Sequence, residues 1–190
     1  MKLASEQRRL LDSLAKEASP LSGMFFRSVE FRWMHPDDVM SGAGAVKVGG
    51  RFAAMGTKAL YASDSEETLL REISGRKQRL AGKALIDVNR YPRVTFRIDL
   101  KIPRHVSFVR ALPSKDLERL RQQCLKPDSL AFSQNVGAHL EASGVQAILY
   151  SSVTGVGNNV VVFVENTKPG DVVIFNRDQL IARIGRFKSS

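Results

Sequence analysis

The chain has 190 residues, of which 43% are hydrophobic and 25% are charged, as expected for one globular domain with its own core. Its net charge of +10, from 29 Lys and Arg against 19 Asp and Glu, favours anionic partners such as a nucleic acid, a phosphorylated metabolite or an acidic protein. The single cysteine, Cys124, excludes an internal disulfide and a cysteine-based metal cage, and no apolar run is long enough to cross a membrane. We therefore expect a cytoplasmic protein.

The first part of the chain predicts a helix and then a strand. Residues 2–17 are amphipathic and end just before Pro20, which predicts a helix that packs through its apolar side. Residues 23–31 are largely apolar and predict a strand. Arg27 interrupts this strand, and an arginine there needs either solvent or a partner because burying an unpaired charge is very costly. Solvent exposure and a role in a site are equally compatible with the sequence.

A glycine-rich segment precedes the next predicted strand. Residues 41–51 match neither GxxxxGK[ST] nor GxGxxG, so the motifs of common nucleotide-binding folds are absent. The paired glycines that end with Gly50 allow a left-handed backbone and close approach to a ligand, so Arg51 is expected to leave a tight turn. Residues 57–62 are short and apolar, lie between turn residues, and predict a strand that carries Tyr61.

A helix is expected directly after this strand. Asp64 followed three residues later by Glu67 is a variant of the capping box, which predicts that the helix begins there. The buried stripe of this helix is expected to consist of Leu69, Leu70 and Ile73. Glu72 then lies at the margin of the apolar face, where its carboxylate can lean into a cleft. A cation, an aromatic ring and a carboxylate thus come in succession from a turn, a strand and a helix.

The rest of the chain predicts further strands and helices. Residues 92–102 alternate between apolar and polar side chains, so a strand with one buried face and one wet face is expected. Helices are expected over 114–123 and 133–142, and strands over 145–150, 160–165 and 171–175. The connector 151–159 places hydroxyl groups just past a buried strand, where they can enter a cleft or stabilise a turn.

The histidines and the basic residues carry little functional signal. His35, His105 and His139 show no metal-binding spacing, so we assign them no catalytic role and expect no metal. The basic residues are scattered, apart from a modest cluster of Arg183, Arg186 and Lys188. Scattered charge is a poor footprint for nucleic acid, so direct nucleic-acid binding is not expected.

Several separate segments resemble the RES-domain family, which is named for its Arg, Glu and Ser residues. They are FFRSVEFR, GxGxxxxGGRF, LYAS, TLLREI and AILYSSVTGVGNNVVVF. Their order and spacing over residues 24–165 make the resemblance more specific than any single motif. The first helix lies outside the match, so we expect an N-terminal helix over 1–20 and a single RES domain over 21–190.

The resemblance assigns roles to particular residues by their place in the motifs. The catalytic candidates are Glu72, Arg51 and Tyr61, and the substrate-binding candidates are Arg27, Ser152 and Gly50. The family commonly has Trp-Asn after the GGR arginine, whereas this chain has Phe52-Ala53. Phe52 keeps the aromatic bulk, but Ala53 cannot make the hydrogen bonds of an asparagine, which questions the turn geometry.

The resemblance implies an α+β fold like that of ADP-ribosyltransferase catalytic domains, a split antiparallel β-core with flanking helices. It also implies that NAD is the substrate. Under this reading Arg51 binds the pyrophosphate through paired hydrogen bonds, and Tyr61 stacks on the nicotinamide. Glu72 stabilises the positive charge that develops as the nicotinamide–ribose bond breaks, while Ser152 orients the substrate or Glu72.

The resemblance further implies an NAD-consuming toxin, of glycohydrolase or phosphorylase type, that a cognate antitoxin with an Xre-type helix-turn-helix region blocks. One alternative keeps the same site but transfers ADP-ribose to a protein target. Another, motivated by the charge of +10, is a basic nucleic-acid-binding module without catalysis. The ADP-ribose acceptor and a homo-oligomeric state are left open by the sequence.

Overall fold

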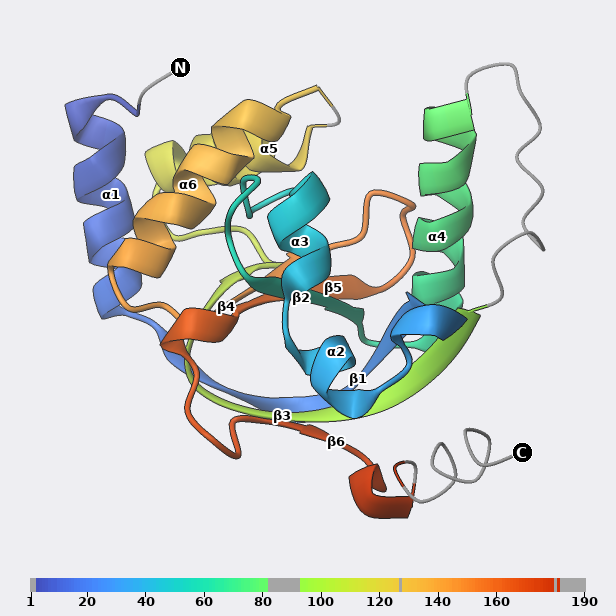
Figure 1. The fold of residues 1–190 in the computed structure, drawn as a ribbon. Helices are drawn as coiled ribbons and strands as arrows, with labels where there is room; N and C mark the ends of the chain where they lie inside the picture. Colours follow the sequence, from blue (N-terminus) through green and yellow to red (C-terminus); the bar gives the residue numbers. More distant parts are fainter. Residues whose placement is uncertain (1–2, 82–92, 127, 180, 182–190) are drawn as a thin grey trace.

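The computed structural model describes residues 3–81, 93–126, 128–179 and 181, and shows an α+β architecture (Figure 1). The strands are β1 (Ser19–Glu30), β2 (Ala59–Ser63), β3 (Arg93–Phe108), β4 (Ala147–Ser151), β5 (Asn158–Phe163) and β6 (Val172–Ile174). The helices are α1 (Ser5–Lys16), α2 (Pro36–Met40), α3 (Ala43–Val48), α4 (Glu66–Ala81), α5 (Lys115–Leu125) and α6 (Leu130–Ala142). Short 3-10 turns lie at η1 (Phe31–Trp33) and η3 (Val164–Asn166). The basic cluster at 183–188 lies outside the described residues.

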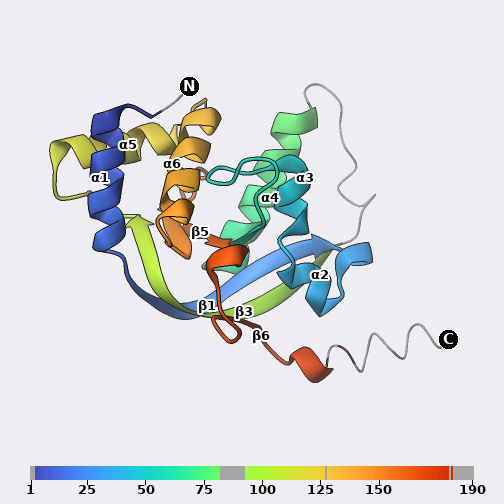
Figure 2. The same cartoon turned by 60° about the vertical axis from the view of Figure 1, so that its left-hand side comes forward.

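The described strands form one sheet in the order β1-β2-β5-β4-β3-β6. Because β1 also pairs with β3, the strands β1, β2, β5, β4 and β3 close into a ring. The β1–β2 junction of this ring has a single register pair, Phe26 with Ser63, so the β-core is nearly split there. In Figure 2, β1 and β3 curve together beneath β5.

The expected antiparallel β-core needs one correction. All strand pairs are antiparallel except β3–β4, in which His105 to Phe108 run parallel to Ala147 to Tyr150. The connection between the two strands explains this direction. Helices α5 and α6 lie between β3 and β4, and they carry the chain back to the level of His105, where β4 begins. A crossover through helices returns a strand in the same direction, whereas a tight hairpin reverses it.

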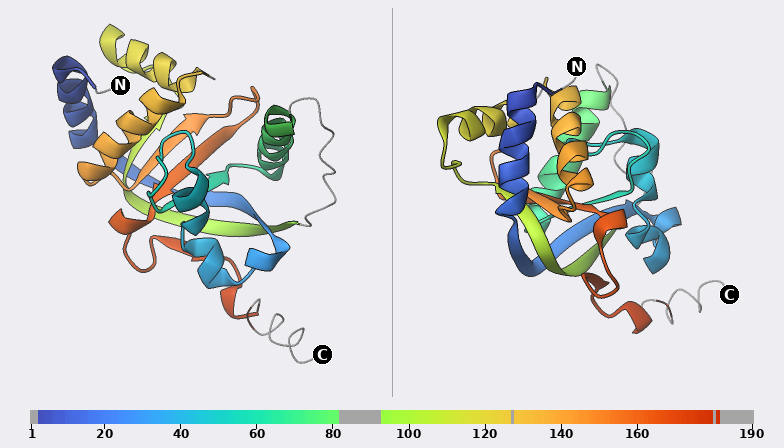
Figure 3. Two further views of the ribbon diagram at one scale, coloured as in Figure 1. Left: turned by 45° about the horizontal axis from the view of Figure 1, so that its top comes forward. Right: turned by 90° about the vertical axis from the view of Figure 1, so that its left-hand side faces the viewer.

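Two hydrophobic clusters lie on opposite faces of β2, β5 and β4. One is covered by the helices and includes Leu11 of α1, Phe52 and Val136 of α6. The other fills the space between these strands and β1 with β3, and includes Phe96 and Ile98. Helices α1, α5 and α6 gather at one side, whereas α4 stands apart from them with α3 between (Figure 3, left). The N-terminal helix therefore contributes to the larger core.

Most predicted elements are present, with shifted ends. The alternation over 92–102 is confirmed, and β3 continues to Phe108. The helix expected over 114–123 is α5, and Ser114 caps it, since its side chain accepts a hydrogen bond from the amide of Leu117. The glycine-rich segment 41–51 contains α3, which begins after Gly42 in a left-handed conformation. No helix in the described ranges is long and apolar enough to cross a membrane.

Two details predicted for α4 are wrong. Ser65, not Asp64, caps the helix, because its hydroxyl accepts from the amide of Thr68. Leu70 is 60% exposed instead of buried. The buried side carries Thr68 and Leu69, and Glu72 follows at helical spacing on that same side. Thr68 and Glu72 therefore lie on the buried side of the helix together with Leu69, whereas Glu66, Glu67 and Arg71 are exposed.

Candidate active site

One face of β2, β5 and β4 carries the polar residues of the candidate site. Tyr61 pairs with Val161, Ser63 pairs with Asn159, and Asn159 also pairs with Tyr150 on the other side. Residues directly opposite each other in a sheet point to the same face, so these side chains project together toward the helices. The three strands place two phenols, a hydroxyl and an amide side by side.

Helix α4 adds a carboxylate to this face. The Oε1 atom of Glu72 accepts a hydrogen bond of 2.6 Å from the Ser152 hydroxyl and one of 2.8 Å from Nδ2 of Asn159. Ser63 in turn donates to Oδ1 of Asn159 at 2.7 Å. The structure therefore joins Glu72 of the helix to Ser152, which is one of the two partners that the prediction allowed for this serine, and its orienting role stays a prediction.

The loop that carries Ser152 is bound to the start of α4. Asp64 accepts hydrogen bonds of 2.9 Å from both the amide and the side chain of Asn158, and a further bond from Thr68. Gly157 is left-handed, and a side chain there would collide with Thr68 and Asp64. The loop that carries the Ser152 hydroxyl is thus held by Asp64, directly before α4, the helix that carries Glu72.

The turn before β2, which carries Gly50 and Arg51, lies against the phenol of Tyr61. The hydroxyl of Tyr61 occupies the space that a side chain at Gly50 would fill, which explains why glycine stands there although its φ is not positive. Nη1 of Arg51 donates to the carbonyls of Cys124 and Lys126, at 2.7 and 3.0 Å. These bonds cap the end of α5. Among the described residues no acceptor is bonded to Nη2 of Arg51, so that edge of the guanidinium can meet a ligand.

Tyr150 lies close enough to all three predicted catalytic residues for them to influence the pKa of its phenol. Burial is the main reason that the pKa of Tyr150 is raised well above its usual value. Tyr61 and Glu72 raise the pKa of this phenol further, whereas the positive charge of Arg51 acts in the opposite direction. The three side chains therefore converge on one region of the molecule, although they come from different elements. Their roles in catalysis stay predictions.

Arg27 does not join this cluster through its side chain. Its guanidinium donates to the carbonyls of Val39 and Tyr61, at 3.0 and 2.9 Å. Burial and the nearby charge of Arg93 lower the pKa of Arg27 to about 10. Of the two possibilities that the sequence left open for Arg27, solvent or a partner, the structure shows a partner: two backbone carbonyls, at the place where β1 and β2 share a single register pair. Its predicted part in substrate binding stays a prediction.

The Ala53 departure leaves the turn intact. The carbonyl of Ala53 accepts a hydrogen bond of 2.7 Å from the amide of Gly50, and Gln134 of α6 donates to the Gly50 carbonyl at 3.0 Å. Phe52 is fully buried, and its ring meets that of Tyr150 edge-on at 5.0 Å. Backbone bonds and a helix side chain therefore hold the Arg51 turn without an asparagine.

Sequence reasoning missed Asn159 and Tyr150. Asn159 stands at the start of the strand NNVVVF, where period-two alternation turns it toward the core together with Val161 and Phe163. A polar residue at an inward position of an otherwise apolar strand was the available signal, since such a group needs a buried partner. Tyr150 gave no comparable signal, because a tyrosine in a buried strand is ordinary.

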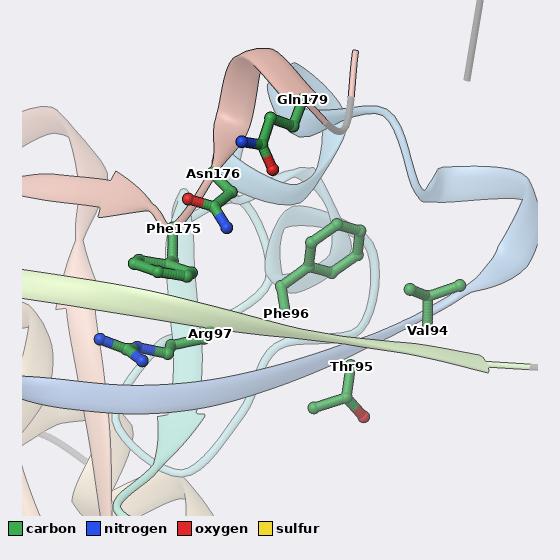
Figure 4. A pocket seen from close by; sticks show the side chains of 7 residues that line it. All are labelled: Val94, Thr95, Phe96, Arg97, Phe175, Asn176 and Gln179. Atoms are coloured by element: carbon green, nitrogen blue, oxygen red, sulfur yellow. The ribbon is translucent and has the colours of Figure 1, made fainter. Parts of the chain in front are cut away.

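Two surface hollows lie at other places on the molecule. One, of about 270 Å³, lies between β3 and the segment after β6 (Figure 4). It is lined by Val94, Thr95, Phe96, Arg97, Phe175, Asn176 and Gln179. The guanidinium of Arg97 stacks on the ring of Phe175 at 4.1 Å, as Figure 4 shows. The other hollow is formed by α5 and α6 and includes Lys126. Neither hollow contains a residue of the predicted site.

The fold and the site together define an α+β protein in which a nearly split β-core presents a hydrogen-bonded carboxylate beside two phenols and a guanidinium. The RES-domain family model matches residues 24–182, so the chain belongs to the RES-domain family. The fold is similar to that in the crystal structure of the M. tuberculosis MbcT–MbcA toxin–antitoxin complex, with a TM-score of 0.68. The two chains are 18% identical, and the likeness covers 90% of this chain and 95% of that chain. No curated protein matches the sequence at a significant level.

Proposed function

We propose that this protein is a toxin that consumes NAD by cleaving the bond between nicotinamide and ribose. The observation that carries the proposal is the geometry of Glu72, whose Oε1 is held by Ser152 and Asn159. No donor among the described residues is bonded to Oε2. A carboxylate anchored through one oxygen can present the other to a reacting centre. The similarity to ADP-ribosyltransferase catalytic domains that the family resemblance implies is part of this proposal.

Each side chain has a distinct task in the proposed reaction. Arg51 binds the pyrophosphate through Nη2, a guanidinium nitrogen that does not bond the carbonyls at the end of α5. Tyr61 stacks on the nicotinamide ring. Glu72 faces the ribose, where positive charge develops as the bond from C1′ to the nicotinamide nitrogen breaks. The electron pair leaves with neutral nicotinamide, and an oxygen of water or phosphate forms the new bond to C1′.

The proposal includes an antitoxin partner and action in the cytoplasm. The similar M. tuberculosis chain comes from a toxin–antitoxin complex, and the family resemblance implies an antitoxin of the Xre type. The net charge of +10 favours an acidic surface on that partner. The complex is then expected to weaken as the salt concentration rises, because exposed charge pairs are screened.

Nicotinamide release from NAD by the purified protein, with no protein acceptor present, tests the proposal. Wild type is expected to release nicotinamide steadily, and Glu72→Gln to lower the rate at least about 100-fold. Glu67→Gln is the matched control, because Glu67 lies on the same helix and, within the described part of the chain, its ion pair is with the exposed Arg71. Its rate should equal that of wild type.

The same assay separates the alternatives. ADP-ribose on a protein target, with no nicotinamide release in its absence, would replace hydrolysis or phosphorolysis by ADP-ribosyl transfer. Nucleic-acid binding that falls steeply with salt and survives Glu72→Gln, without any loss of NAD, would contradict the enzyme.

A further inference from the structure

We propose that Asn159 and Ser63 are positioning residues that hold Glu72 for the reaction, an inference that rests on the proposed function. Both lie inside the protein, with 6% of Asn159 and 2% of Ser63 exposed. They face each other in register across β2 and β5. The chain Ser63 to Asn159 to Glu72 consists of two hydrogen bonds, of 2.7 and 2.8 Å.

The direction of these hydrogen bonds follows from the chemistry of the groups. An ionised carboxylate only accepts, so Asn159 must turn its Nδ2 toward Glu72. Its Oδ1 then faces Ser63, whose hydroxyl must donate. The carboxylate of Glu72 therefore selects between the two orientations of the amide, which are nearly equal in shape, and the Ser63 hydroxyl pairs with the amide oxygen in the selected one. The rejected orientation would place an oxygen against the carboxylate.

A second chain of donors ends on the same oxygen. Ser152 has one hydroxyl hydrogen, which it donates to Oε1 of Glu72 at 2.6 Å. Because this hydrogen goes to Glu72, the 2.7 Å contact between the Ser152 and Thr154 hydroxyls must have threonine as its donor. The Ser152 oxygen also accepts from the amide of Thr154 at 3.1 Å. Two hydrogen-bond chains, one from β2 and β5 and one from the loop after β4, thus meet at Oε1. Their joint effect is to fix the direction in which Oε2 points.

The position of the Ser63–Asn159 pair argues for a purpose beyond packing. The neighbouring pairs on this face join Tyr61 to Val161 and Ala59 to Phe163. Buried polar groups cost free energy unless they are hydrogen-bonded, and an apolar pair would fill the same place without that requirement. The polar pair stands only where Glu72 reaches the sheet. Its contribution is therefore expected in the rate of reaction and not in the stability of the fold.

The decisive variant is the double substitution Ser63→Ala with Asn159→Leu, which replaces both polar groups by apolar ones of similar shape. Removing both partners avoids an unpaired buried group, so the variant should unfold close to the wild-type temperature. Its kcat for nicotinamide release should fall about 10- to 100-fold while KM changes less than about threefold, because the lost hydrogen bond acts on a charged group at the reacting centre. Asn159→Leu alone should lower kcat equally, and adding Ser63→Ala to it should lower kcat no further.

A stably folded double variant with wild-type kcat would overturn the inference and leave the proposed function standing. Wild type that releases no nicotinamide contradicts the proposed function itself, and the positioning is then judged from a crystal structure of the double variant. In that structure the Glu72 carboxylate should have left its place beside Ser152 or occupy several conformers. A carboxylate that stays in its original place, in a single conformer, would refute the positioning role.

Discussion

Gly137 of α6 lies directly against the backbone carbonyl of Phe52, in the turn that carries Arg51. A β-carbon at 137 would overlap that carbonyl, so α6 can approach the turn only with glycine at this position. Gly137→Ala is therefore expected to lower the free energy of unfolding by about 1–3 kcal/mol, the usual cost of overpacking. Urea-induced unfolding measures the effect.

Gly44→Ala is the matched control, because a β-carbon at Gly44 in α3 meets no atom within 4 Å. Alanine is the better helix former, so this variant should be neutral or gain up to about 1 kcal/mol of stability. Equal losses from the two alanines would show that α6 does not rest on the turn as described.

Asp64 is expected to act on both stability and turnover. Asp64→Asn leaves one acceptor oxygen where the carboxylate has two, so either the bonds from Asn158 or the bond from Thr68 is lost. We expect a loss of about 1–3 kcal/mol in unfolding free energy, together with slower nicotinamide release as the Ser152 loop loosens. Asp178→Asn, at a side chain that is 98% exposed, should change neither. A normal rate in a destabilised Asp64→Asn would separate the loop clamp from the reaction.

Arg51 has a structural task in addition to its predicted catalytic one. Arg51→Gln removes the donor to two carbonyls at the end of α5, and should cost about 1–2 kcal/mol of stability. If Arg51 also binds the pyrophosphate, KM for NAD should rise in the same variant. Arg119→Gln on α5, at a side chain that is 83% exposed, serves as the control for lost positive charge. An unchanged KM in Arg51→Gln would confine this residue to capping the helix.

The lowered pKa of Glu118 predicts that the free energy of unfolding depends on pH. Its hydrogen bond from Arg121, supported by the amide of Leu112, lowers the pKa of Glu118 from 4.5 to about 2. Because the pKa is lower in the folded state, the stabilisation is complete above about pH 4.5 and is lost as the pH falls toward 2. Melting temperatures of wild type and Glu118→Gln should therefore differ at neutral pH and converge in acid. A difference that stays constant from pH 6 to about pH 2 would exclude this linkage.

The sequence predicted the local elements well because their signals lie between near neighbours. Alternation identified β3, and a serine followed by an amphipathic run identified α5 with its cap. The placement of Glu72 at the margin of its helix also followed from spacing, although the buried stripe was wrong at Leu70. A side chain on a helix is buried only where another element covers it, and the chain order alone does not say where that happens.

The amino-acid sequence by itself determined the order of strands and helices, the family, and the set of charged and aromatic residues from which a site could be built. Only the tertiary structure decided that β3 and β4 run parallel, that Arg27 bonds two carbonyls, and that Asn159 reaches Glu72. The physical reason is distance along the chain. Helical and strand periods are set by residues a few positions apart, whereas the partner of a buried polar group is selected by the packing of segments that are far apart in sequence.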